Sequence, residues 1–298
     1  MNVADYLARI NYAGQLEPTL ENLRKITLAH KLAVPYTNMQ IHGGPRIRLD
    51  LKKQFENIVT NRGGGVCYEL NGLFVWLLRE LGYKVICVES AFFSDGKFTC
   101  QRHHFVITVD FDDLGRYMVD PGWIMVGPMK FVTMVPYYDG HHVYRIRHVP
   151  DQADNWYYFE KHKKTILDRD GCILKQGPSV TKPTSGFCDE ECAKEESSHW
   201  QFEQRINDTE HQFEDFVDMI DHLYEPDCII TKNVALVRMN ENSYSLAFGD
   251  TAYTKEVVDH FTDKIIKEDK LTTNAEVEYV VKNKFRIALH HPVNFFKS

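Results

Sequence analysis

The spacing of apolar residues changes at Tyr83, and this change constrains the fold more than any other feature of the chain. Upstream of it, apolar residues recur every three or four positions, which predicts helices over about residues 20–26, 51–59 and 67–81. Downstream of it they alternate, which predicts strands at residues 84–88, 104–109, 117–120, 143–147 and 156–159. A helical first part is therefore followed by a β-rich part.

The rest of the chain mixes both patterns. Residues 175–198 combine Gly, Pro and Ser with acidic residues and predict a long loop. The spacing beyond it predicts partly helical structure at 202–223, a hairpin of 233–239 and 243–248, and helices at 257–267 and 274–284. This order predicts an α+β fold of three domains: a helical bundle over residues 1–83, a β-barrel over 84–198 with an insertion at about 175–198, and an α/β lid over 199–298.

Charge and cysteine content limit the class of protein. The net charge is −7 and the sequence pI is near 6.1, which argues against a nucleic-acid partner. The seven cysteines show no framework spacing, so we expect free thiols in a reducing, cytoplasmic compartment. The first residues lack the pattern of a secretory signal peptide, and no stretch is long and apolar enough to predict a transmembrane helix, so we expect no membrane partner. The oligomeric state is undetermined, and a monomer is compatible with the sequence.

The most informative run is Arg-Gly-Gly-Gly-Val-Cys-Tyr-Glu-Leu-Asn, which ends at Asn71. It places Cys67 at the start of an apolar helix, after three glycines that let a substrate or backbone approach closely. A free cysteine is often just a small core residue. At a helix N-terminus, however, the partial positive charge stabilises a thiolate, so Cys67 is also a candidate nucleophile.

Two further residues complete a candidate triad. His104 begins an apolar strand, and Asp120 ends the next one, so neighbouring strands would bring the two side chains together. Each residue alone has a commoner structural explanation. Together, Cys67, His104 and Asp120 have the chain order of a thiol nucleophile, its proton partner and an orienting carboxylate.

The sequence resembles the arylamine N-acetyltransferases. The resemblance covers nearly the whole chain and is most specific in Tyr-Leu-Ala-Arg-Ile (6–10), Pro-Thr-Leu-Glu-Asn-Leu (18–23) and Val-Pro-Tyr-Thr-Asn (34–38), and it continues through the glycine–cysteine run, His104 and Val119-Asp120. It implies three domains with a catalytic core similar to that of the thiol proteases. It also implies a ping-pong reaction in which Cys67 takes an acetyl group from acetyl-CoA and passes it to an arylamine, arylhydroxylamine or hydrazine.

The resemblance also suggests secondary roles. It favours His104 over His103, since the family histidine lies five residues before a strand valine, here Val109. It implies that Val66 and Trp123 line a substrate pocket, which Ile124 narrows in place of a glycine. Its coenzyme contact corresponds to Thr231, for which an ordinary structural role is equally expected. It implies no metal, and Cys188 and Cys192 lack the second pair of ligands that a structural zinc site needs.

Two positions depart from the family pattern. Where the family has a glutamate and an arginine that pair near the active site, this chain has Thr37 and Gly63, while Arg62 lies one residue earlier. We expect the pair to have been replaced together, since a lone buried charge is costly. Two alternatives stay open on the sequence: a thiol hydrolase or transglutaminase-like enzyme with the same triad, and a catalytically silent binding protein of this fold.

Overall fold

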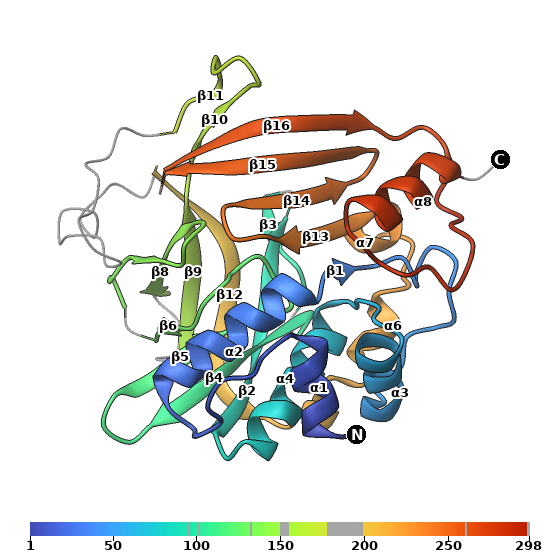
Figure 1. Ribbon diagram of the computed structural model, residues 1–298. Coiled ribbons are helices and arrows are strands. Elements are labelled where there is room, and N and C mark those ends of the chain that lie inside the picture. The colour runs from blue at the N-terminus through green and yellow to red at the C-terminus, as the bar shows by residue number, and fades with distance from the viewer. Residues whose placement is uncertain are drawn as a thin grey trace.

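The structure is a computed structural model that describes residues 1–94, 96–100, 102–131, 133–149, 155–177, 199–259 and 261–296. A group of helices at the N-terminal end packs against two sheets (Figure 1). This mixture of helices and sheets confirms the predicted α+β class. Within the described residues, no helix has the length and apolar character needed to span a membrane.

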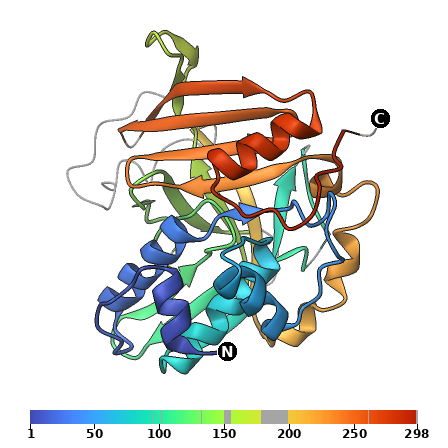
Figure 2. The ribbon, with the colours of Figure 1, turned by 45° about the vertical axis from the view of Figure 1, so that its right-hand side comes forward.

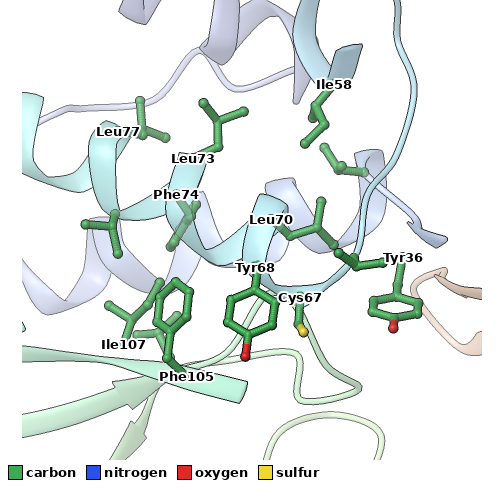
Figure 3. Packing of buried hydrophobic residues seen from close by; sticks show 14 of the residues in the cluster. Tyr36, Ile58, Cys67, Tyr68, Leu70, Leu73, Phe74, Leu77, Phe105 and Ile107 are labelled. Carbon is green, nitrogen blue, oxygen red and sulfur yellow. The ribbon is translucent and has the colours of Figure 1, made fainter. Parts of the chain in front are cut away.

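Four helical segments form the N-terminal part: α1 (Val3–Arg9), α2 (Leu20–Ala33), α3 (Leu51–Phe55) with a π-helical continuation (Glu56–Thr60), and α4 (Cys67–Glu80). The hydroxyl of Thr19 caps α2 by accepting a hydrogen bond from the Asn22 N–H at 3.2 Å. Helix α4 is buried along most of its length and forms the centre of the largest apolar core (Figure 3). The three helices predicted before Tyr83 are therefore confirmed.

The first sheet has nine strands and curves into a barrel-like shape beside α4. Its order is β6-β5-β4-β2-β12-β9-β8-β7, and β3 pairs with β2. The strands are β2 (Lys84–Ser94), β3 (Lys97–Phe98), β4 (His104–Phe111), β5 (Gly115–Val119), β6 (Met129–Lys130), β7 (Tyr137–Tyr138), β8 (Val143–His148), β9 (Trp156–His162) and β12 (Trp200–His211). All five strands predicted from alternation before residue 160 are present.

The second sheet has seven strands in the order β1-β13-β14-β15-β16-β10-β11. They are β1 (Tyr36–Thr37), β10 (Thr165–Leu167), β11 (Ile173–Lys175), β13 (Ala235–Met239), β14 (Ser243–Phe248), β15 (Thr251–Asp259) and β16 (Thr262–Lys270). Helix α8 (Asn274–Asn283) lies across one face of this sheet (Figure 2) and buries Val277, Val280 and Val281 there. The predicted hairpin of β13 and β14 and the helix at α8 are confirmed.

The helix predicted at 257–267 is wrong, and the partly helical structure predicted at 202–223 is present only in the second half of that range. Residues 202–211 belong to strand β12, whereas the short turns Phe213–Phe216 and α6 (Met219–His222) are helical. β12 lies between β2 and β9, so its backbone hydrogen bonds are made with both neighbours. The segment 257–267 instead contains the end of β15, the turn and the first part of β16. Two irregularities in the register of this strand pair disturb strict alternation and imitate a helical spacing.

The predicted domain boundaries stay a prediction. The two sheets exchange strands across the proposed division at residue 198, because β12 joins the first sheet whereas β10 and β11 join the second. Most of the predicted loop, residues 178–198, lies outside the described residues, and Lys175 ends strand β11.

Candidate active site

Cys67 is the first residue of α4, and Val66 separates it from the three glycines. The Glu69 carboxylate accepts a hydrogen bond from the Val66 N–H at 3.1 Å, which fixes the start of the helix. A Cβ on Gly122 would lie 2.7 Å from the Cys67 Cα, so only glycine lets the segment after Asp120 approach so closely. The Cys67 side chain lies between Tyr36 and Tyr68 and is 4% exposed (Figure 3).

His104 and Asp120 meet because β4 and β5 are neighbours. Their antiparallel register pairs Ile107 with Val119, which places the start of β4 beside the residue that follows β5. Nε2 of His104 lies 2.8 Å from Oδ2 of Asp120, and both side chains are almost completely buried. Asp120 therefore holds the Nε2 side of the ring, and the other side-chain interaction of His104 is with Cys67.

The electrostatics of the pair favour a charged imidazole. Burial by itself lowers the pKa of His104, but the Asp120 carboxylate and the Cys67 sulfur outweigh it and raise the pKa to about 10. Burial also opposes ionisation of Asp120, yet the His104 ring and two amide donors hold the pKa of that carboxyl below its ordinary value. The structure thus brings Cys67, His104 and Asp120 together, and their catalytic roles stay a prediction.

Two amide side chains that the sequence analysis did not single out hold Asp120 in place. Asn71, one turn after Cys67 on α4, donates to Asp120 Oδ1 at 2.9 Å and accepts from the Gly122 N–H at 2.7 Å. Gln204 of β12 donates to Asp120 Oδ2 at 3.0 Å. The Ser90 hydroxyl in turn donates to Oε1 of Gln204 at 2.7 Å. Asn71 lies four residues after Cys67 and therefore on the same face of the helix, which could have revealed its contact with Asp120. No local feature of the sequence marks Gln204.

Lys31 of α2 is a third residue that sequence reasoning missed. Its ammonium is buried and donates to the carbonyl oxygens of Pro121, at 3.0 Å, and of Trp123. Burial is the main influence on this side chain and lowers the pKa of Lys31 to about 8. These hydrogen bonds hold the segment after Asp120 against helix α2.

The other predicted site residues are Trp123, Val66 and Thr231. Trp123 is half-buried; its ring lies 4.5 Å from that of Phe92, and its Nε1 donates to Glu203 at 3.1 Å. The Val66 side chain has no exposed surface, and the Thr231 hydroxyl donates to the Leu223 carbonyl at 2.5 Å within the segment around α7 (Ile229–Lys232). Their roles stay predictions.

His103 contacts a different cysteine, Cys228. Its Nε2 lies 3.8 Å from the Cys228 sulfur, and burial is the first cause that lowers the pKa of His103, to about 4. A neutral imidazole directed at another thiol differs from the charged ring of His104. The preference for His104 is therefore supported by the geometry.

The two departures from the family pattern occur side by side. The Thr37 methyl lies 2.9 Å from where a Cβ on Gly64 would be, and a Cβ on Gly63 would lie 2.6 Å from the side chain of Asn57. Arg62 is exposed, and no ion pair of Arg62 occurs among the described residues. Arg9 instead donates to three backbone carbonyls in this region, those of Ile58, Ala33 and Gly63.

Metal-ligating residues do not gather in the described part of the chain: no group of three or more His, Cys, Asp or Glu side chains has a suitable arrangement there. Cys188 and Cys192 lie outside the described residues. The described cysteines are free thiols: Cys67, Cys87, Cys100, Cys172 and Cys228.

A protein-family model described as N-acetyltransferase matches residues 19–293. This chain belongs to the arylamine N-acetyltransferase family. It is 26% identical to the liver isozyme of arylamine N-acetyltransferase from Gallus gallus, over 99% of each chain. It is 37% identical to the pineal gland isozyme NAT-3 from the same organism, over 45% of this chain and 48% of that protein, so the latter match spans about half of that relative.

The structure of this family member also matches solved structures. The Mycobacterium marinum arylamine N-acetyltransferase in complex with CoA has a TM-score of 0.75 at 20% identity, over 96% of this chain and 93% of that one. At this level of identity the match establishes the fold. The N-acetyltransferase described here thus has the fold of the family, with Cys67, His104 and Asp120 adjacent in its interior.

Proposed function

We propose that this N-acetyltransferase transfers an acetyl group from acetyl-CoA to an arylamine, arylhydroxylamine or hydrazine through an acetyl-Cys67 intermediate. The observation that carries this proposal is the buried contact of His104 with Asp120 at 2.8 Å beside a cysteine that begins a helix. A charged imidazole stabilises a thiolate, and a thiolate attacks thioesters readily.

The reaction has two steps that use one site. The Cys67 thiolate attacks the thioester carbonyl, the C–S bond to CoA breaks, and the departing CoA sulfur takes the proton of His104. The amine nitrogen then attacks the acetyl-cysteine carbonyl, His104 accepts the amine proton, and the Cys67 thiolate leaves. Asp120 keeps Nε2 of His104 engaged, so that Nδ1 exchanges the proton in both steps.

Several observations support the choice of substrates. The curated relatives are arylamine N-acetyltransferases, and one solved relative holds CoA. Trp123 and Phe92 present aromatic surface next to His104, whose ring lies 4.5 Å from Phe92. In this proposal Trp123 and Val66 line the pocket for the acceptor amine, and Thr231 contacts the coenzyme. The free thiols of the described cysteines suit a cytoplasmic enzyme.

The test is to trap the intermediate. The full chain is mixed with acetyl-CoA, quenched rapidly and digested, and the mass of the peptide that contains Cys67 is measured. We expect one acetyl group on Cys67, none in Cys67→Ala, and normal labelling in Cys172→Ala, which removes an exposed thiol. A subsequent arylamine addition should remove the label and yield acetylarylamine.

The same experiment separates the alternatives. A thiol hydrolase would release acetate at a rate that the amine does not change. A silent binding protein would show no label, and the reaction of Cys67 with iodoacetamide would be unaffected by His104→Gln. Either result would refute the proposed transfer.

A further inference from the structure

Strand β12 contains a bulge beside the candidate triad. In its pairing with β9, Phe202 lies opposite Glu160 and Gln204 lies opposite Phe159, so Glu203 has no partner residue on β9. Successive residues of a regular strand point to opposite faces of the sheet, yet Glu203 and Gln204 are both buried. The bulge therefore lets two consecutive side chains reach the interior.

These two side chains hold one segment. Gln204 donates to Oδ2 of Asp120 at 3.0 Å, and Oε2 of Glu203 accepts from Nε1 of Trp123 at 3.1 Å. Asp120 and Trp123 both belong to the short segment that follows β5. One local irregularity of β12 thus fixes the carboxylate of the candidate triad and the indole of Trp123 together.

The other oxygen of Glu203 is also engaged. Oε1 accepts from Nε2 of Gln201 at 2.7 Å and lies 2.9 Å from Nζ of Lys161. The Glu203 side chain is 8% exposed, and a carboxylate buried to this extent is costly unless it is paired and hydrogen-bonded. Contacts on both oxygens therefore fix the carboxylate, and the carboxylate fixes the indole that donates to it.

The ring of Trp123 continues a row of aromatic rings that begins at His104. The ring of Phe92 lies 4.5 Å from that of His104, and the ring of Trp123 lies 4.5 Å from that of Phe92. Trp123 is half-buried, so part of its ring remains exposed for contact with a ligand. Aromatic rings attract one another in offset-stacked and edge-to-face arrangements, which depend on their orientation.

We propose that Glu203 is a positioning residue that sets the affinity of the site for acceptors that carry an aromatic ring. The inference rests on the proposed function, in which Trp123 lines the pocket for the acceptor amine. Glu203 acts through Nε1 of Trp123: it holds the indole in the orientation that packs against the ring of an arylamine, and it does not touch the reacting atoms. An acceptor without a ring, such as hydrazine, does not depend on Glu203.

The test compares para-toluidine with hydrazine as acceptors for Glu203→Gln in the full chain. We expect KM for para-toluidine to rise about fivefold with kcat nearly unchanged, because an uncharged acceptor holds the indole less firmly. KM for hydrazine and the rate at which acetyl-CoA acetylates Cys67 should stay the same. Glu210→Gln is the matched control, since Glu210 is an exposed residue of the same strand, and it should change none of these values.

Two further variants test the contact itself. Glu203→Asp keeps the charge beside Lys161 but shortens the side chain that reaches Trp123, so it should raise KM for para-toluidine selectively even if Glu203→Gln does not fold. Trp123→Phe keeps an aromatic ring and removes the Nε1 donor. In the Trp123→Phe background, Glu203→Gln should change KM for para-toluidine less than about twofold, because the hydrogen bond that it weakens is already absent.

Three results would overturn the inference. They are an equal loss for para-toluidine and hydrazine, an equal loss in Glu203→Gln and Glu210→Gln, and additive effects of Glu203→Gln and Trp123→Phe. A native chain that takes no acetyl group on Cys67 would refute the proposed function and this inference with it. Normal acetylation of Cys67 with equal losses for both acceptors would refute the role of Glu203 alone.

Discussion

The side-chain amide of Asn71 donates a hydrogen bond of 2.9 Å to Oδ1 of Asp120. The same amide group donates to the Phe105 carbonyl at 2.7 Å, and its oxygen accepts from the Gly122 N–H. One residue of α4 therefore connects the helix that begins at Cys67 with the strand of His104 and with the segment after Asp120. The orientation of the candidate triad depends on this connection.

Asn71→Ala should reduce both activity and stability. It leaves Asp120 Oδ1, the Phe105 carbonyl and the Gly122 N–H without their buried partner, which should cost about 3 kcal/mol of unfolding free energy. We expect acetyl transfer to fall about 100-fold at a temperature where the variant is folded, because Asp120 loses its fixed orientation. Urea unfolding and steady-state kinetics measure the two effects. Full activity in a destabilised variant would mean that Asn71 has only a structural role.

Asp120→Asn should change the pH dependence of Cys67. Without the carboxylate, only the Cys67 sulfur still opposes the effect of burial on His104, so the pKa of the imidazole falls from about 10 and the ring is neutral at pH 7. The alkylation rate of Cys67 by iodoacetamide at pH 7 should fall about 1000-fold, because the thiolate loses its cationic partner. The native rate should remain high between pH 7 and 9. A profile that Asp120→Asn leaves unchanged would contradict the proposed pair.

Lys31→Met should loosen the segment that carries Trp123. The variant removes the ammonium from the carbonyls of Pro121 and Trp123 while it keeps the apolar stem. We expect KM for the arylamine to rise several-fold, about the effect of one lost charge-assisted hydrogen bond, with a smaller change in kcat. Lys25→Met is the matched control, since Lys25 lies on the same helix and forms an exposed pair with Glu21. Equal effects of both variants would exclude a specific role for Lys31.

Glu69→Gln should flatten the stability profile. Burial raises the pKa of the Glu69 carboxyl from the ordinary 4.5 to about 7, so the folded chain retains a proton that the unfolded chain releases between these values. The raised pKa of Glu69 therefore destabilises the native protein as pH rises from about 4.5 to about 7, by about 3 kcal/mol in total.

The glutamine cannot ionise but can still accept from the Val66 N–H. Urea unfolding at pH 5 and pH 8 should thus show Glu69→Gln gaining stability relative to the native chain at the higher pH. Glu80→Gln, an exposed change on the same helix, should give no such gain. If the difference in unfolding free energy between Glu69→Gln and the native chain is the same at pH 5 and pH 8, the Glu69 carboxyl is already ionised at pH 5.

Local pattern was enough to place much of the candidate site. The start of α4 at Cys67 followed from the glycine run and the apolar stripe, and the strands of His104 and Asp120 followed from alternation. These predictions succeeded because each depends on the few residues around it. Gln204 could not be found in this way, since it is 84 residues from Asp120 and lies in a segment whose spacing suggested a helix.

The sequence by itself determined the order of helices and strands over the first half, the family, and the residues that make up the candidate triad. Only the tertiary structure decided that β12 joins the barrel-like sheet and that Asn71, Gln204 and Lys31 support the site. The physical reason is the range of the interactions. Periodicity and helix capping act within a few residues, whereas strand pairing and buried hydrogen bonds join residues that only the folded chain brings together.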